Sequence, residues 1–173
     1  FNAVAKGYGI DLIGRYLDSK NINNYLIELG GEILAKGKNI DKNKSWVVGI
    51  ENVYSDLNNR SYSATIALTN IALATSGNYR KFRVDSLTGK KYVHTLNPLT
   101  GSAEKSDITS ATVLASTCAE ADAYATSFMA LGIEKSKELV IKLEGIEVYL
   151  TYNDENNKEQ VFATEGLKKI IQD

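Results

Sequence analysis

Hydrophobic positions along this chain repeat with two different spacings, and the order of the spacings predicts the fold. Alternating or short continuous apolar runs predict strands at 25–29, 32–37, 46–50, 62–69, 71–75, 79–84, 91–96, 147–152 and 160–163. We expect 62–69 and 71–75 to be adjacent antiparallel strands. Helices are predicted at 3–20, 135–143 and 164–171. Because strands and helices mix without βαβ regularity, we predict an α+β fold with a mainly antiparallel sheet and packed helices.

The stretch Thr112–Gly132 predicts a strand followed by a helix, and the rest of the chain is organised around it. Thr117 stands at the N-cap position and Glu120 follows three residues later, which predicts a capping box in which each side chain satisfies a free amide. Small residues, which allow close approach to the helix backbone, recur at Ala119, Ala121, Ala123, Ala125, Ser127 and Ala130.

Asp122 and Thr126 lie four residues apart, so both side chains project from one face of this helix. A carboxylate and a hydroxyl placed in this way can hold Mg²⁺, which takes one or two carboxylates and leaves room for phosphate oxygens. Alternatively, Asp122 is a solvated acid favoured by the helix dipole, and Thr126 bonds back to its own helix. The helix taken alone leaves both interpretations open.

The predicted helix near the N-terminus is amphipathic. Its apolar face is expected to consist of Tyr8, Leu12 and Tyr16, with Ile13 and Leu17 beside them. Gly7 and Gly9 lower helix stability near its start. A close neighbour explains them, and tight packing of helices explains them equally well.

Three further positions have chemical potential. His94, the sole histidine, lies near a predicted strand end and can act as a general base near neutral pH, or it is an ordinary surface or core residue. Cys118 lies in a first helical turn, where a thiolate is favoured, or it fills a small buried space. Gly30 and Gly31 form a turn or bulge, or give a ligand access to the backbone.

Composition narrows the classes of function. The 173 residues correspond to one domain, residues 1–173, with 20 basic and 21 acidic side chains, so nothing indicates a nucleic-acid partner. A single cysteine excludes an internal disulfide framework. The chain starts in mid-pattern at Phe1, and we expect it to be part of a longer protein whose first half is missing.

Five segments together resemble the ApbE family of FAD:protein FMN transferases. They are A-V-A-K-G-Y-G-I-D at 3–11, N-Y-L-I-E-L-G-G-E-I at 24–33, A-T-S-G-N-Y at 74–79, Y-V-H-T-L-N-P-L-T-G at 92–101 and A-S-T-C-A-E-A-D-A-Y-A-T at 115–126. They occur in the order typical of the family and correspond to its C-terminal half. The resemblance implies an ApbE-like, T-fold-related domain whose N-terminal half, which helps enclose the flavin and adenine, is absent.

The resemblance also implies chemistry. Family members use Mg²⁺ and FAD, transfer FMN to a threonine hydroxyl of an acceptor flavoprotein, and release AMP. By motif, Mg²⁺ would be held by the carbonyl of Ala3, the carboxylate of Asp122 and the hydroxyl of Thr126. Contacts to FAD are implied for Lys6, Leu96, Gly30, Gly31, Ser76 and Gly77. His94 would deprotonate the acceptor threonine.

Some residues depart from the family pattern. Asn97 and Leu99 flank the proline where the family often has Asp and Arg, and Glu32 replaces a frequent Asp after the paired glycines.

Two alternative functions stay open, an FAD pyrophosphatase yielding FMN and AMP, and a flavin-binding module without catalysis. The resemblance further implies an acceptor protein of the redox-pump or electron-transfer type, a possible homodimer, and a place outside the cytoplasmic membrane as a lipoprotein.

Overall fold

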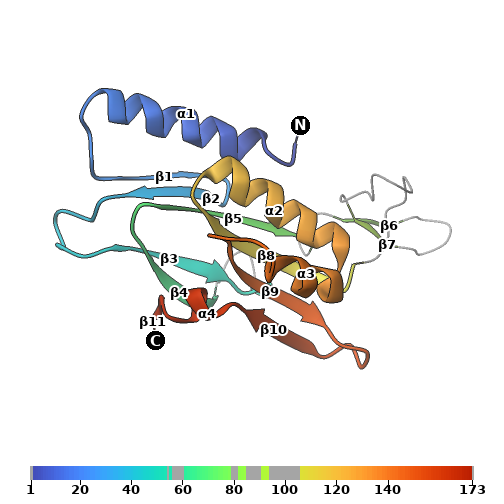
Figure 1. The fold of residues 1–173 in the computed structure, drawn as a ribbon. Helices are drawn as coiled ribbons and strands as arrows, with labels where there is room; N and C mark the ends of the chain where they lie inside the picture. The colour runs from blue at the N-terminus through green and yellow to red at the C-terminus, as the bar shows by residue number, and fades with distance from the viewer. Residues whose placement is uncertain are drawn as a thin grey trace.

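The computed structural model describes residues 2–53, 55, 61–78, 82–84, 91–93 and 106–172. It confirms the predicted α+β class with antiparallel sheets (Figure 1). The helices are α1 (Ala5–Ser19), α2 (Cys118–Leu131), α3 (Ile133–Val140) and α4 (Glu165–Lys168). The strands are β1 (Tyr25–Leu29), β2 (Glu32–Lys36), β3 (Trp46–Glu51), β4 (Tyr62–Leu68), β5 (Ile71–Gly77), β6 (Phe82–Val84), β7 (Lys91–Val93), β8 (Ile108–Ala115), β9 (Glu147–Asn153), β10 (Glu159–Ala163) and β11 (Ile171–Gln172).

The largest sheet in the described part of the chain has six strands in the order β1-β2-β5-β8-β9-β10, with every neighbouring pair antiparallel. A second sheet has the order β11-β4-β3, and β6 pairs with β7. The expected pairing of 62–69 with 71–75 is therefore wrong. The chain crosses from one sheet to the other between β4 and β5, so strands that are consecutive in sequence lie in different layers.

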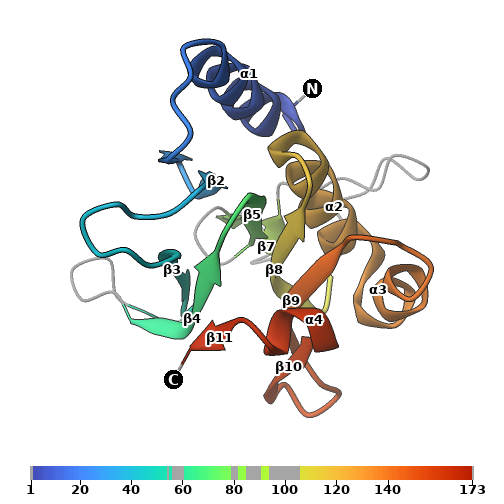
Figure 2. The same ribbon diagram turned by 60° about the vertical axis from the view of Figure 1, so that its left-hand side comes forward.

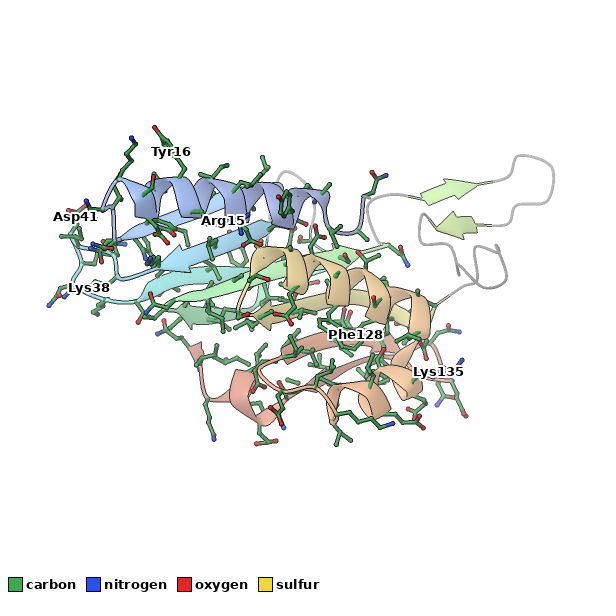
Figure 3. The ribbon with its side chains drawn as sticks, turned by 45° about the horizontal axis from the view of Figure 1, so that its top comes forward. Arg15, Tyr16, Lys38, Asp41, Phe128 and Lys135 are labelled. Atoms are coloured by element: carbon green, nitrogen blue, oxygen red, sulfur yellow. The ribbon has the colours of Figure 1, made fainter. Side chains whose placement is uncertain are left out.

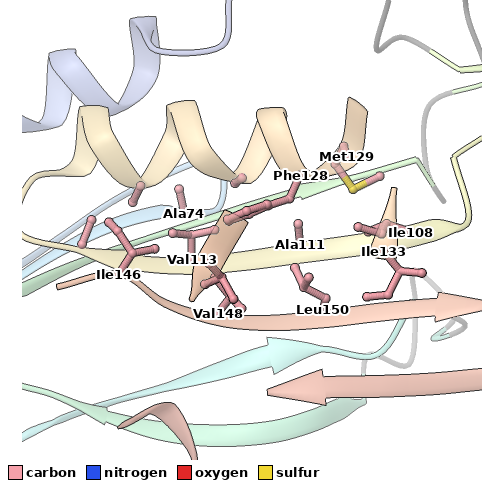
Figure 4. Packing of buried hydrophobic residues seen from close by; sticks show 14 residues of the cluster. Ala74, Ile108, Ala111, Val113, Phe128, Met129, Ile133, Ile146, Val148 and Leu150 are labelled. Atoms are coloured by element: carbon pink, nitrogen blue, oxygen red, sulfur yellow. The ribbon is translucent and has the colours of Figure 1, made fainter. Parts of the chain in front are cut away.

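The molecule has three layers, visible in Figures 1 and 2. Helices α1, α2 and α3 cover one face of the six-stranded sheet, and the β11-β4-β3 sheet with α4 covers the other. Neighbouring strand residues point to opposite faces, so Val113 packs under α2 whereas Leu114 packs toward the second sheet. Phe128 is fully buried at the centre of the cluster below α2 (Figure 4), and its burial contributes about 2 kcal/mol.

The α1 helix forms where predicted, but the expected buried face is wrong. Its buried residues are Gly7, Ile10 and Gly14. The predicted apolar residues Tyr8, Leu12, Ile13 and Tyr16 are exposed, and Leu17 is partly buried. The glycines decide the orientation, because a side chain at Gly7 would be 2.3 Å from the carbonyl oxygen of Cys118. The helix therefore packs through two glycines and Ile10.

The remaining differences lie near the C-terminus. The predicted helix at 135–143 begins and ends earlier, as α3. The predicted helix at 164–171 is limited to α4, and Ile171 and Gln172 instead pair with Ile66 and Thr65 as β11. The hairpin of β9 and β10 is confirmed. Of the predicted strands at 79–84 and 91–96, residues 82–84 and 91–93 are strands, and the other positions lie outside the described residues.

Candidate functional site

The candidate site is built where the start of α1 crosses α2. The backbone N–H of Gly7 donates to Oδ2 of Asp122 at 3.1 Å. Asp122 is only 3% exposed, so the alternative of a solvated acid is wrong. Among the described residues, Oδ1 of Asp122 accepts no hydrogen bond. One carboxylate oxygen is thus fixed by the protein, and the other keeps its lone pairs.

The second predicted residue of the helix pair, Thr126, lies against β5. Its hydroxyl is 3.3 Å from Oγ of Ser76. Ser127, by contrast, donates back to the carbonyl of Ala123 at 2.8 Å, which is the bond that the alternative interpretation assigned to Thr126. The fold therefore brings together two residues from separate motifs, Ser76 and Thr126, with Gly77 exposed at the end of β5.

Lys6 pairs with a buried acid, Glu32, which directly follows the paired glycines in the sequence. Nζ of Lys6 lies 2.5 Å from Oε2 of Glu32, whose residue is 2% exposed, while the Lys6 side chain is about half exposed. Gly30 and Gly31, at φ 64° and 105°, form the two-residue turn between β1 and β2. Positive φ at both turn positions suits a tight hairpin and favours glycine. Of the interpretations left open for the two glycines, the structure shows the turn.

Burial governs the electrostatics of this region. It raises the pKa of Asp122, and the Gly7 N–H and the Lys6 ammonium oppose that rise. It also raises the pKa of Glu32, where the Lys6 ammonium opposes the rise and the nearby Asp122 charge adds to it. Two partly desolvated carboxylates beside one ammonium would gain from an additional cation.

Cys118 belongs to the packing, and its surroundings disfavour a thiolate. Its residue is fully buried, and burial, followed by the charges of Asp11, Glu32 and Asp122, raises the pKa of the thiol to about 12. The interpretation as a small buried residue is confirmed.

The start of α2 is capped in a way that the sequence pattern did not indicate. Thr117 accepts from the N–H of Glu120 at 3.2 Å, as predicted. The other half of the capping box is wrong, because the Glu120 carboxylate accepts from Ser116. Asp11 of α1 instead accepts from the N–H groups of Cys118 at 2.8 Å and Ala119 at 2.9 Å. Sequence reasoning gave Asp11 no role and named Glu32 only as a departure from the family pattern, since only tertiary contacts reveal what these two residues do.

Of the remaining predicted site residues, only Ala3 lies within the described part of the chain. Ala3 is partly buried just before α1. His94 and Leu96, together with Asn97 and Leu99, lie outside the described residues. A cavity of about 280 Å³ between α1, β2 and the start of α2 is lined by residues such as Asp11, Arg15 and Lys36, and none of the predicted site residues within the described ranges lines it.

The donor set suits a hard cation in its chemistry. In the part of the chain that the structure describes, no group of three or more His, Cys, Asp or Glu side chains is arranged to hold a metal ion. The predicted set uses one carboxylate, one hydroxyl and one backbone carbonyl, all oxygen donors of the kind that Mg²⁺ prefers.

Within the described ranges of the chain, the helices are too short or too polar to cross a membrane.

Comparison with known proteins identifies a family that matches this chain. The ApbE family model matches residues 1–150. FAD:protein FMN transferases from Haemophilus influenzae and Vibrio cholerae are 37% and 34% identical, covering 90% and 98% of this chain but 43% and 49% of those proteins. The chain thus spans about half the length of the curated relatives it matches.

Solved structures agree with the sequence matches. The flavin transferase ApbE from Vibrio cholerae superposes with a TM-score of 0.79 at 31% identity, over 97% of this chain and 51% of that one. The ApbE protein from Thermotoga maritima gives a TM-score of 0.82 at 26% identity, over 99% and 52%. The family match, the curated relatives and the shared fold lead to one conclusion: this chain belongs to the ApbE family.

Proposed function

We propose that this chain is the C-terminal portion, residues 1–173, of a flavin transferase domain that moves FMN from FAD to a threonine hydroxyl of an acceptor flavoprotein and releases AMP. The observation that carries the proposal is the juxtaposition of Gly7 with the buried Asp122, because it places the start of α1 beside the face of α2 that carries Asp122 and Thr126. Relatives named FAD:protein FMN transferase support the reaction class.

Magnesium is part of the proposal. Ala3, Asp122 and Thr126 would supply a carbonyl, a carboxylate and a hydroxyl oxygen. When bound, Mg²⁺ stabilises the negative charge that develops on a reacting pyrophosphate. The Gly7 N–H keeps the Asp122 carboxylate in one orientation, and Oδ1 is the oxygen that this bond leaves for the cation.

Lys6 is suited to a phosphate. Its ammonium is anchored by the buried Glu32 and remains about half exposed, so it can contact an anion without a large rearrangement. In this proposal Ser76, Gly77, Gly30 and Gly31 line the path of the cofactor, as does Leu96.

His94 is proposed as the base. The threonine oxygen attacks the phosphorus of the FMN portion, a new P–O bond forms, and the P–O bond to AMP breaks. The threonine proton passes to the imidazole of His94, and AMP carries away the bonding electrons. A base of suitable pKa accelerates such a step by roughly 10²–10⁴-fold.

The proposal is tested with the polypeptide from the complete gene, FAD, Mg²⁺ and a threonine-containing acceptor domain, analysed by mass spectrometry. We expect a mass gain of one FMN that is lost with a chelator. FMN and AMP without adduct would instead indicate a pyrophosphatase, and FAD binding without any product would indicate a binding module.

Two variants divide the roles within the same assay. Asp122→Ala is expected to abolish the Mg²⁺-dependent transfer, and retained transfer would remove Asp122 from the metal site. His94→Ala is expected to lower transfer while FAD binding persists, and undiminished transfer would remove His94 as the base.

The setting of the reaction is also a proposal. The acceptor would be an electron-transfer or redox-pump subunit, and the protein would act outside the cytoplasmic membrane as a lipoprotein. Detection of the protein and of flavinylated acceptor in the membrane fraction, accessible to protease added from outside the cytoplasm, tests the location. Oligomeric state, including the homodimer, is tested by light scattering.

A further inference from the structure

Glu32 is an acidic residue buried under α1. It is the first residue of β2 and directly follows the turn of Gly30 and Gly31. The next residue, Ile33, pairs with Leu73 of β5 and packs toward the second sheet. Neighbouring strand residues point to opposite faces, so the Glu32 side chain points toward α1, which lies beside α2 and over β1 and β2 (Figure 3). Pairing on both sides of β2 therefore fixes the place from which the Glu32 carboxylate extends.

The partner of this acid is the ammonium of Lys6, in the first turn of α1. Oε2 of Glu32 lies 2.5 Å from Nζ of Lys6, and the Glu32 side chain is 2% exposed whereas that of Lys6 is 48% exposed. A buried carboxylate without a partner is costly, so the ion pair holds the long Lys6 side chain against Glu32. Within the described part of the chain, Nζ makes no other hydrogen bond. Two of its three N–H groups therefore remain for a ligand.

The next residue of α1 binds the second buried acid of this region. The Gly7 N–H donates to Oδ2 of Asp122, so consecutive residues of α1 contact Glu32 of β2 and Asp122 of α2. The Lys6 ammonium also lowers the pKa of Asp122, which places its charge within electrostatic reach of that carboxylate. A phosphate bound where α1 crosses α2 would therefore meet an ammonium whose position Glu32 has already fixed.

We propose that Glu32 is a positioning residue for FAD, an inference that rests on the proposed function: it holds the Lys6 ammonium toward the FAD phosphates and so raises the affinity for FAD. The Glu32 carboxylate is buried and negative, so it can favour a phosphate only through Lys6. A lysine ammonium on its flexible stem loses rotational freedom when it binds an anion. An ammonium that is already held loses less of this freedom, and the phosphate binds more tightly.

Glu32→Gln tests the positioning in the polypeptide produced from the complete gene. The amide keeps the size of the side chain but loses the charge that holds the ammonium, and Lys6 can then turn into water. We expect the Kd for FAD, measured by flavin fluorescence without an acceptor, to rise about tenfold, the contribution of one charged hydrogen bond. The KM for FAD should rise similarly while kcat changes less, because the phosphate contact forms before the reaction. An unchanged Kd would overturn the proposal.

A second substitution determines whether Glu32 acts through Lys6. Lys6→Met is added to Glu32→Gln, so that neither side chain leaves an unpaired buried charge. If Glu32 acts by holding the ammonium, the double variant should bind FAD as weakly as Glu32→Gln alone. A clear further loss of affinity would show that Lys6 contributes fully without Glu32, and the proposal would be wrong.

Asp18→Asn is the matched control. Asp18 of α1 and Lys36 of β2 form a second ion pair between the same two elements, with Oδ1 and Nζ 2.7 Å apart, near the other end of α1. We expect this variant to keep the native Kd for FAD. A loss equal to that of Glu32→Gln would show that an α1–β2 ion pair acts only through the fold, and would also overturn the proposal. The Kd is measured without transfer, so failure of this inference and failure of the proposed reaction are distinguishable.

Discussion

Gly7 and Asp122 are joined by a hydrogen bond of 3.1 Å although 115 residues separate them. The bond exists because Gly7 lacks a side chain and the backbone of α1 can approach that of α2. Burial between the packed helices raises the pKa of the Asp122 carboxyl, and the Gly7 N–H opposes that rise. The packing of α1 on α2 and the position of Asp122, the candidate metal ligand, therefore both depend on Gly7.

Replacing that glycine should disrupt the helix crossing. In Gly7→Ala the new methyl would lie 2.3 Å from the backbone oxygen of Cys118, and overpacking of this kind costs about 1–3 kcal/mol. Chemical denaturation of the native protein and of Gly7→Ala measures the loss in the free energy of unfolding. Gly9→Ala is the control, since open space surrounds it and Ala is about 1 kcal/mol better than Gly in a helix. Equal stabilities for the two variants would contradict the described crossing.

Asp122→Asn separates charge from packing. The amide oxygen can still accept the Gly7 N–H, and a neutral group avoids the burial penalty that raises the pKa of the carboxyl. We expect stability without metal to be maintained or increased, and the rise in melting temperature produced by Mg²⁺ to disappear. Glu120→Gln removes the same charge elsewhere on α2 and should keep the Mg²⁺ response. A response retained in Asp122→Asn would exclude this carboxylate as a ligand.

Asp11 is expected to stabilise α2 from outside that helix. It accepts two free amides at the helix start, and loss of a capping side chain costs about 1 kcal/mol. Asp11→Ala should therefore lower the free energy of unfolding by about that amount. Asp41→Ala, in an exposed loop, is the control. The prediction is wrong if Asp11→Ala is no more destabilising than the loop variant.

Asp154 gives the β9–β10 hairpin a dependence on pH. The N–H of Lys158, followed by that of Asn156, holds the pKa of this carboxyl below its usual 3.8. The native state thus releases the proton more readily than the unfolded state. The stabilisation is present above pH 3.8 and is lost as the pH falls through the native pKa.

Asp154→Asn removes this titration while leaving an oxygen to accept the same bonds. We expect the stability difference between the native protein and Asp154→Asn to shrink from near-neutral pH to below 3.8. Denaturant unfolding of both proteins at the two pH values measures it. A difference that does not change with pH would show that the carboxylate charge has no net role.

The sequence by itself determined the features that depend on neighbouring residues. Apolar spacing located α1 and the β9–β10 hairpin, and the four-residue interval placed Asp122 and Thr126 on one face of α2. Local hydrogen bonding predicted Thr117 as the N-cap. The five motifs identified the family that the comparisons confirm. These features follow from helix and strand periodicity and from side chains acting on their own backbone.

Only the tertiary structure decided which surfaces meet. Apolar spacing favoured Tyr8 and Tyr16 as the buried side of α1, yet the small residues Gly7 and Gly14 are buried, because close approach of two backbones depends on what lies opposite. The same reason applies to Asp11, which caps a helix 107 residues away. The burial of Asp122 raises its pKa. This burial results from the packing of the layers and cannot be predicted from a local sequence pattern.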